Sequence, residues 1–91
     1  GSGMRIKIVE GMALGKPIVT TSIGTEGIET TSGENILIAD DAESFNSSIY
    51  QLIEDRATSD RIGKNAIDFI RKKFDNLALA AQLIEFYKKH L

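Results

Sequence analysis

The sequence contains no cysteine and no tryptophan, and a single proline and a single histidine occur among its 91 residues. Without cysteine, the chain can form no disulfide, no thiolate metal site and no cysteine nucleophile, and a reducing cytoplasm suits it. Basic residues are not in excess either, since 11 Lys and Arg against 13 Asp and Glu give a net charge of −2. This balance disfavours binding to the phosphates of DNA or RNA, so we expect no nucleic-acid partner.

Long apolar runs are also missing. No stretch approaches the roughly 20 apolar residues of a membrane-spanning helix, so we expect no transmembrane segment, and we expect no signal peptide. The content of 42% hydrophobic and 26% charged residues is ordinary for a soluble globular domain. The chain opens on Gly1, Ser2 and Gly3 ahead of Met4. Gly-Ser is a common remnant of tag removal, and these residues can equally be native sequence from a protein cut upstream.

Apolar spacing and turn residues predict the order of the elements. Residues 4–14 have helical spacing that ends at Gly15 and Pro17, and residues 17–21 read as a short β-branched strand. A glycine-rich loop follows at 22–33, and a second apolar strand follows at 35–39. Three more helices complete the prediction: one capped by Asp40, one capped by Thr58 or Ser59 that runs through Lys73, and one capped by Asp75 that runs to about His90.

Two short apolar strands without polar alternation are typical of a buried parallel sheet in an α/β protein. Two parallel strands do not make a stable sheet by themselves, because such sheets are normally larger and covered on both faces. We therefore predict an α/β fold class: a partial Rossmann-like domain with two short parallel strands and about four helices. We expect residues 1–91 to form one incomplete domain, the end of a doubly wound domain whose beginning is absent.

Residues 3–19 read GMRIKIVEGMALGKPIV. This stretch resembles the G-x-x-x-K-x-x-E-A-M-A-x-G-K-P-V-V motif of GT-B glycosyltransferases of the group 1, family 4 type. The likeness continues in the loop SIGTEGI at 22–28, in GENILIADD at 33–41, which is similar to the family's G-E-N-G-L-L-V strand, and in the closing pairs Phe74-Asp75 and Phe86-Tyr87. The resemblance covers essentially the whole chain.

The resemblance implies a fold and a function. In GT-B enzymes of this type two Rossmann-like domains flank a cleft, and the C-terminal domain binds a nucleotide sugar. The chain resembles the last two strands and the terminal helices of that C-terminal domain. The intact protein is then expected to be a hexosyltransferase-type enzyme of carbohydrate biosynthesis that retains anomeric configuration. Its donor substrate is expected to be a UDP- or GDP-sugar, without a further cofactor or bound metal, and the fragment alone is expected to be inactive.

Glu10 is the foremost candidate for binding. The resemblance equates it with the second glutamate of the family's E-x7-E motif, which hydrogen-bonds the ribose hydroxyls. A carboxylate suits that task, because it accepts from two vicinal hydroxyls at once. On pattern alone, Glu10 also reads as a solvated helix residue. The first glutamate of the motif falls at Ser2, so the sequence departs from the family pattern there.

The start of the first helix supplies further candidates. Backbone N–H groups at a helix start suit phosphate or sugar oxygens, and two cations there suit a diphosphate, although solvated surface charge explains them equally. The donor-binding candidates are Gly3, Met4, Arg5, Ile6 and Lys7. The loop after the first strand is where α/β folds place ligand loops, and we expect it to line the acceptor side of the cleft, although a plain flexible connection explains it as well. Its candidates, called here the 24–27 loop, are Gly24, Thr25, Glu26 and Gly27.

We assign no catalytic residue and no metal ligand from the sequence, and His90 reads as a helix-end cation. A second interpretation is a non-catalytic α/β interaction module that self-associates through an open strand edge. Unpaired edge groups and exposed isoleucine and valine favour association, so we expect a homodimer through edge pairing or helix exchange. The intact enzyme is expected in the cytoplasm or peripheral to a membrane, with the upstream part of its own chain as partner.

Overall fold

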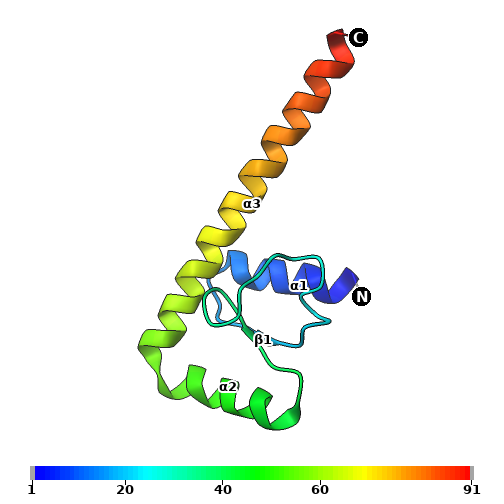
Figure 1. Cartoon of the computed structure of the whole chain (residues 1–91). Helices are drawn as coiled ribbons and strands as arrows, with labels where there is room; N and C mark the ends of the chain where they lie inside the picture. Colours follow the sequence, from blue (N-terminus) through cyan, green and yellow to red (C-terminus); the bar gives the residue numbers. More distant parts are fainter. Residues whose placement is uncertain (1, 91) are drawn as a thin grey trace.

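The computed structural model describes residues 2–90, and for residues 2, 78–83, 86, 87, 89 and 90 it describes the backbone alone. Along the chain, the elements are α1 (Ser2–Ala13), β1 (Val19–Thr20), β2 (Leu37–Ile38), α2 (Ala42–Glu54) and α3 (Arg56–His90). Figure 1 shows α1, α2 and the strands gathered around the first half of α3. The predicted α/β fold class with two short parallel strands is confirmed.

The two strands pair in parallel, with Val19 opposite Leu37 and Thr20 opposite Ile38. The ladder includes two bonds of 2.9 Å, from the Leu37 N–H to the Ile18 carbonyl and from the Ala39 N–H to the Thr20 carbonyl. Since successive residues of a strand direct their backbone groups to opposite edges, the N–H and C=O of Val19 face away from β2. Within the described residues the sheet has two strands, so this edge of β1 is open. Both strands are shorter than the predicted 17–21 and 35–39.

The hydrophobic core lies between α1, the first half of α3 and the start of β2. Its buried members are Ile8, Met12, Ile36, Ala66 and Ile70. The two helices approach so closely that a Cβ on Gly63 would collide with the Gly15 carbonyl oxygen. Gly15 itself has a φ of +75°, a backbone conformation that favours glycine. This close approach lets α1 and α3 bury their apolar faces against each other.

The prediction of about four helices is wrong, because the described residues form three and α3 runs without interruption through Asp75. Neither proline nor glycine occurs between Lys64 and His90. Asp and Asn have low helix propensity, but each costs less than about 0.7 kcal/mol relative to alanine. Asp75 and Asn76 therefore lie inside one long helix instead of separating two.

Two predicted helix caps are also wrong. Asp41, not Asp40, caps α2, because its carboxylate accepts a 2.8 Å bond from the Ser44 N–H. Asp55, not Thr58 or Ser59, precedes α3 and accepts a 3.1 Å bond from the Thr58 N–H. In each case the carboxylate bonds the N–H three residues ahead, as N-caps do. The sequence offered several adjacent capping residues, and the position of the first helical turn decided between them.

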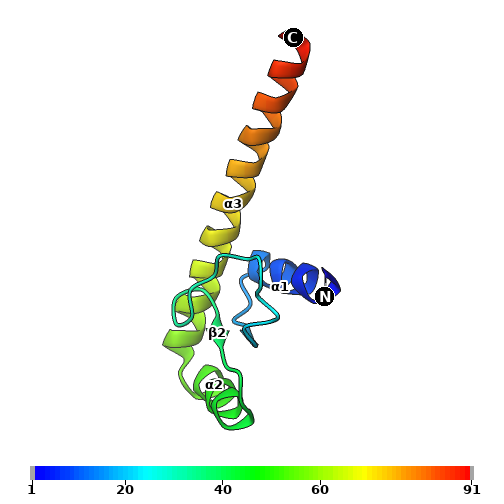
Figure 2. The same ribbon diagram turned by 45° about the vertical axis from the view of Figure 1, so that its right-hand side comes forward.

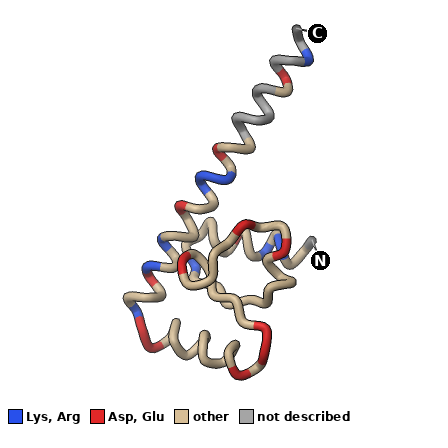
Figure 3. The backbone as a smooth tube through the Cα atoms, in the orientation of Figure 1, with Lys and Arg blue, Asp and Glu red and all other residues tan. Residues whose placement is uncertain are grey.

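The second half of α3 extends beyond the rest of the molecule in both views (Figure 2). The molecule is accordingly elongated, with principal extents of 55 × 26 × 17 Å. Leu77 and Ile84 on this segment are 57% and 55% exposed, so apolar residues occur here without the cover of a neighbouring element. Lys and Arg are interspersed with Asp and Glu along the described part of α3, with one run of three basic residues at 71–73 (Figure 3).

Candidate functional site

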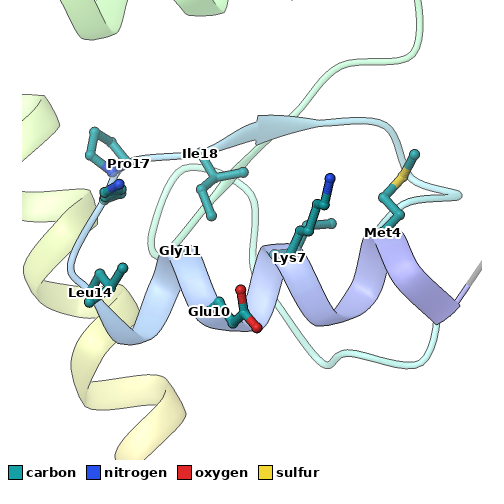
Figure 4. Close-up of a pocket in the computed structure, with 9 residues that line it drawn as sticks. Met4, Lys7, Glu10, Gly11, Leu14, Pro17 and Ile18 are labelled. Carbon is teal, nitrogen blue, oxygen red and sulfur yellow. The ribbon is translucent and has the colours of Figure 1, made fainter.

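The turn after α1 sets the geometry of the site. The Gly15 N–H donates to the Met12 carbonyl and the Lys16 N–H donates to the Gly11 carbonyl, both at 3.0 Å. These two bonds around a left-handed glycine form a Schellman motif, which ends the helix and reverses the chain. Pro17 then starts the return. As a result, β1 runs back along α1, and its carboxyl end lies beside the amino-terminal turn of the helix (Figure 4).

A groove of about 570 Å³ runs between α1 and β1. It is lined by Met4, Lys7, Ile8, Glu10, Gly11, Leu14, Lys16, Pro17 and Ile18. Ile18 points from the strand toward Gly11 (Figure 4), and its Cδ1 lies 2.8 Å from where a Cβ on Gly11 would stand. Gly11 stands where the family motif E-A-M-A has its first alanine. Ile18 fills the space that the methyl group of that alanine would need.

Glu10 lies on the exposed face of α1, one helical turn from Lys7, and both line this groove (Figure 4). Lys16 lines the same groove from the turn after the helix. The exposed position leaves the carboxylate oxygens of Glu10 accessible to a ligand's hydroxyl groups. Lys16 was not among the predicted site residues, although its place between Gly15 and Pro17 indicated that it would lie at the helix end.

The five donor-binding candidates at the start of α1 are spread around the helix. Met4 and Lys7 line the groove, whereas Arg5 extends toward the 24–27 loop. Ile6 is 58% exposed and does not line the groove, and Gly3 has open space where a Cβ would stand. Neighbouring helical residues diverge by about 100°, so a contiguous run of candidates forms no single cluster.

The 24–27 loop packs on the amino-terminal turn of α1. The sulfur of Met4 lies 3.0 Å from where a Cβ on Gly24 would stand, and Arg5 Nη1 lies 3.5 Å from the equivalent point at Gly27. Gly27 has a φ of +86°. Thr25 is buried, whereas Glu26 is exposed. The structure therefore brings together two groups of candidates, the helix start predicted for the donor and the loop predicted for the acceptor side.

Asp40, which was predicted to cap a helix, holds this loop. The carboxylate of Asp40 accepts bonds from the N–H and the hydroxyl of Ser22, at 2.8 and 3.0 Å. Asp41 is occupied as the cap of α2, and its hydrogen bond from the Ser44 N–H lowers the pKa of the carboxyl below the ordinary value of 3.8. The two adjacent aspartates therefore have different roles: Asp40 bonds to the loop after β1, and Asp41 caps α2.

Within the described side chains, no group of three or more His, Asp or Glu residues is placed to hold a metal ion. His90 lies outside the described side chains. In the described part of the chain, no helix combines the length and apolar character needed to cross a membrane.

Comparison with known proteins gives two matches. A family model described as Glycosyl transferases group 1 matches residues 1–55. A protein of Klebsiella pneumoniae, described as an uncharacterized 44.6 kDa protein in cps region, is 33% identical over 76 residues, which are 84% of this chain and 20% of that protein. The chain thus spans about a fifth of the length of that relative. No solved structure matches.

Proposed function

Because the chain belongs to the group 1 glycosyl transferases, we propose that it forms the closing part of a nucleotide-sugar-binding domain. The intact enzyme would transfer a sugar, of the hexosyl kind, from a UDP- or GDP-sugar to an acceptor. We further propose a GT-B architecture of the family 4 type, with retention of anomeric configuration. The family membership supports sugar transfer, and the finer assignments rest on the motif resemblance.

One observation carries the proposal. The amino-terminal turn of α1 and the 24–27 loop meet beside the carboxyl end of β1. In open α/β sheets, ligands bind outside the carboxyl ends of the strands, and the free N–H groups at a helix start favour an anion. Both features coincide at the start of α1, about two helical turns from Glu10, the residue that the motif resemblance assigns to the donor.

Within this site the residues take distinct roles. The N–H groups at the start of α1 and the side chain of Arg5, which extends toward the 24–27 loop, would face the diphosphate, whose negative charge grows as it departs from the sugar. Lys7 lines the groove on another face of the helix and would add positive charge beside the donor. Fixed donors and cations at such a place lower the barrier, because they stabilise charge that develops in the transition state. Glu10 would accept hydrogen bonds from the ribose hydroxyls. The 24–27 loop would border the place where the acceptor approaches.

The 91-residue chain by itself is expected to be inactive. A transfer reaction needs both substrates held in one geometry, and the other wall of the cleft would come from the upstream part of the same polypeptide. We place the intact enzyme in the cytoplasm, free or peripheral to a membrane.

The test is an amide NMR titration of the labelled chain with UDP, GDP and ADP in turn. Shifts for one nucleotide, confined to residues 3–10 and 24–27, are expected. Glu10→Gln should weaken that binding by roughly tenfold, because hydrogen bonds to a charged group are the strong ones. Glu43→Gln, at an exposed glutamate on α2, is the matched control. An absence of shifts at millimolar nucleotide would contradict a donor-binding site in this chain.

A specific observation also favours self-association. In the part of the chain that the structure describes, the edge of β1 that faces away from β2 is open, and apolar grooves flank the strand on both sides. The second groove has a volume of about 400 Å³ and is lined by Pro17, Val19, Phe45, Ile49, Leu52, Ile53 and Ser59. Open edges with exposed apolar neighbours invite pairing. We therefore propose a homodimer of the chain through this edge, compatible with the enzymatic role.

Sedimentation of variants tests the dimer. Leu14 and Ile53 are 70% and 73% exposed, one beside each groove. Leu14→Lys and Ile53→Lys should each shift the chain toward the monomer. Tyr50→Lys is the matched control, since Tyr50 is 65% exposed on the same helix as Ile53 and does not line the groove. A wild-type chain that sediments as a monomer at millimolar concentration would exclude the dimer.

A further inference from the structure

Asp40 makes two hydrogen bonds that connect the carboxyl ends of the two strands. Its carboxylate accepts from the Ser22 N–H at 2.8 Å and from the Ser22 hydroxyl at 3.0 Å. Ser22 lies just after β1 and Asp40 just after β2, 18 positions apart in the sequence. Hydrogen bonds to a charged acceptor are stronger than neutral ones. Asp40 therefore holds Ser22, the second residue after β1, at a fixed place.

From Ser22 the connection continues into the loop. The Thr25 hydroxyl donates to the Ser22 carbonyl at 3.3 Å, and the Gly24 N–H donates to the Thr21 hydroxyl at 3.2 Å. Further along, the Ile28 N–H donates to the Thr25 carbonyl at 2.8 Å, and Ile28 packs against the hydrophobic core. The loop thus has an apolar anchor at Ile28 and a polar anchor at Ser22.

Between these anchors the loop touches α1. Gly24 lies against Met4 and Gly27 lies against the guanidinium of Arg5. A chain of contacts therefore runs from Asp40 through Ser22 to the amino-terminal turn of α1. Asp40 itself does not line the groove between α1 and β1, so it would act on the site through the loop.

We propose that Asp40 is a positioning residue: by holding Ser22, it fixes the 24–27 loop against Met4 and Arg5 and so sets the shape of the donor site. The effect of Asp40 on a donor site rests on the proposed function. The effect of Asp40 on the position of the loop is independent of that function, because it is a property of the chain without ligand. Asp41 supplies the matched control, since the adjacent carboxylate caps α2 and makes no bond to the loop.

The test compares amide NMR spectra and hydrogen exchange of Asp40→Ala, Asp40→Asn and Asp41→Ala without any ligand. In Asp40→Ala, the amides of the 24–27 loop and those of Met4 and Arg5 should shift, and the Ser22 amide should exchange roughly tenfold faster. Asp40→Asn should restore most of the wild-type spectrum, because its amide oxygen can accept from the Ser22 N–H. Asp41→Ala should change α2 and leave the loop unchanged.

Unchanged Met4 and Arg5 amides in Asp40→Ala would overturn the proposal. If that variant does not fold, Ser22→Ala decides in its place: it removes only the hydroxyl donor and should shift the same amides by less. In a second arm, UDP, GDP and ADP are titrated into each variant. Asp40→Ala should bind the nucleotide severalfold more weakly than Asp41→Ala, and equal affinities would remove the positioning role.

A failure of all three nucleotides to bind the wild-type chain would count against the proposed function. The ligand-free comparison would then still decide whether Asp40 holds the loop against α1.

Discussion

The two halves of α3 share a four-residue spacing of apolar residues, but among the described residues only the first half packs against other elements. Ile62, Ala66 and Ile70 follow one another at four-residue spacing, and none of them is more than 4% exposed. Phe74 continues that spacing and is 53% exposed. The helix is continuous through this point, so the backbone does not cause the change.

The cause is the end of the tertiary contacts. The first half of α3 packs against α1 and α2, and the second half extends past both (Figures 1 and 2). An apolar stripe on a helix therefore indicates which face can be buried. It stabilises the fold only where a neighbouring element covers that face. Substitutions along α3 measure this difference.

The largest expected effect separates the two halves directly. Ile62→Ala removes a fully buried side chain and should lower the free energy of unfolding by about 2–5 kcal/mol. Phe74→Ala should change it by less than about 0.5 kcal/mol, because surface substitutions contribute little. Urea unfolding followed by circular dichroism measures both. Equal losses at the two positions would mean that Phe74 is covered in solution.

The crossing of α3 over α1 is the next test. Gly63→Ala should lower the free energy of unfolding by about 1–3 kcal/mol, because the added methyl group meets the backbone of Gly15, which cannot move aside. Without that contact, alanine would stabilise the helix by up to about 1 kcal/mol. Lys64→Ala, at the exposed neighbouring position, is the control. A stabilised Gly63→Ala chain would show that the helices do not cross so closely.

Two aspartates test where α3 begins and whether it is continuous: Asp55 precedes the helix and Asp75 lies inside it. Asp55→Ala removes the carboxylate that accepts from the Thr58 N–H and hydroxyl, and should lower the free energy of unfolding by about 1 kcal/mol. Asp75→Ala should leave it unchanged or raise it by up to about 0.7 kcal/mol, because Asp75 lies inside the helix and alanine is the better helix former. If Asp75→Ala lowered the free energy of unfolding as much as Asp55→Ala, a helix would start at Asp75 and α3 would not be continuous. Thermal unfolding of both variants checks this.

The smallest expected effect is a pH dependence of the same caps. The bonds from the Thr58 hydroxyl and N–H lower the pKa of Asp55 below its ordinary value of 3.8, and Ser44 does the same for the pKa of Asp41. A lowered folded-state pKa adds stability that is fully present above about pH 3.8 and is lost as the pH falls through the folded-state value. Unfolding free energies should therefore decline below about pH 3.8, and Asp55→Asn should flatten part of that decline. If the decline of the unfolding free energy with pH were the same in Asp55→Asn, Asp55 would not contribute to it.

Local signals predicted much of the fold. Gly15 and Pro17 indicated both the end of α1 and the return of the chain, and the β-branched residues after Pro17 indicated a buried parallel strand. Each signal depends on residues within a few positions of one another, which is why it survives without the rest of the structure. For the candidate site, the motif resemblance pointed to Glu10 and the helix start pointed to residues 3–7, and neither gave an indication of their neighbours.

The sequence by itself determined the element types, the parallel pairing and the motif that places the chain among the group 1 glycosyl transferases. Only the tertiary structure decided that Asp40 holds Ser22 while Asp41 caps α2, and that the 24–27 loop lies on Met4 and Arg5. The physical reason is separation along the chain. A cap such as Asp41 or a turn forms between residues three or four positions apart. The bond of Asp40 to Ser22 and the contacts of the 24–27 loop with Met4 and Arg5 join segments about 20 positions apart, and the path of the backbone between them selects one partner among several equivalent side chains.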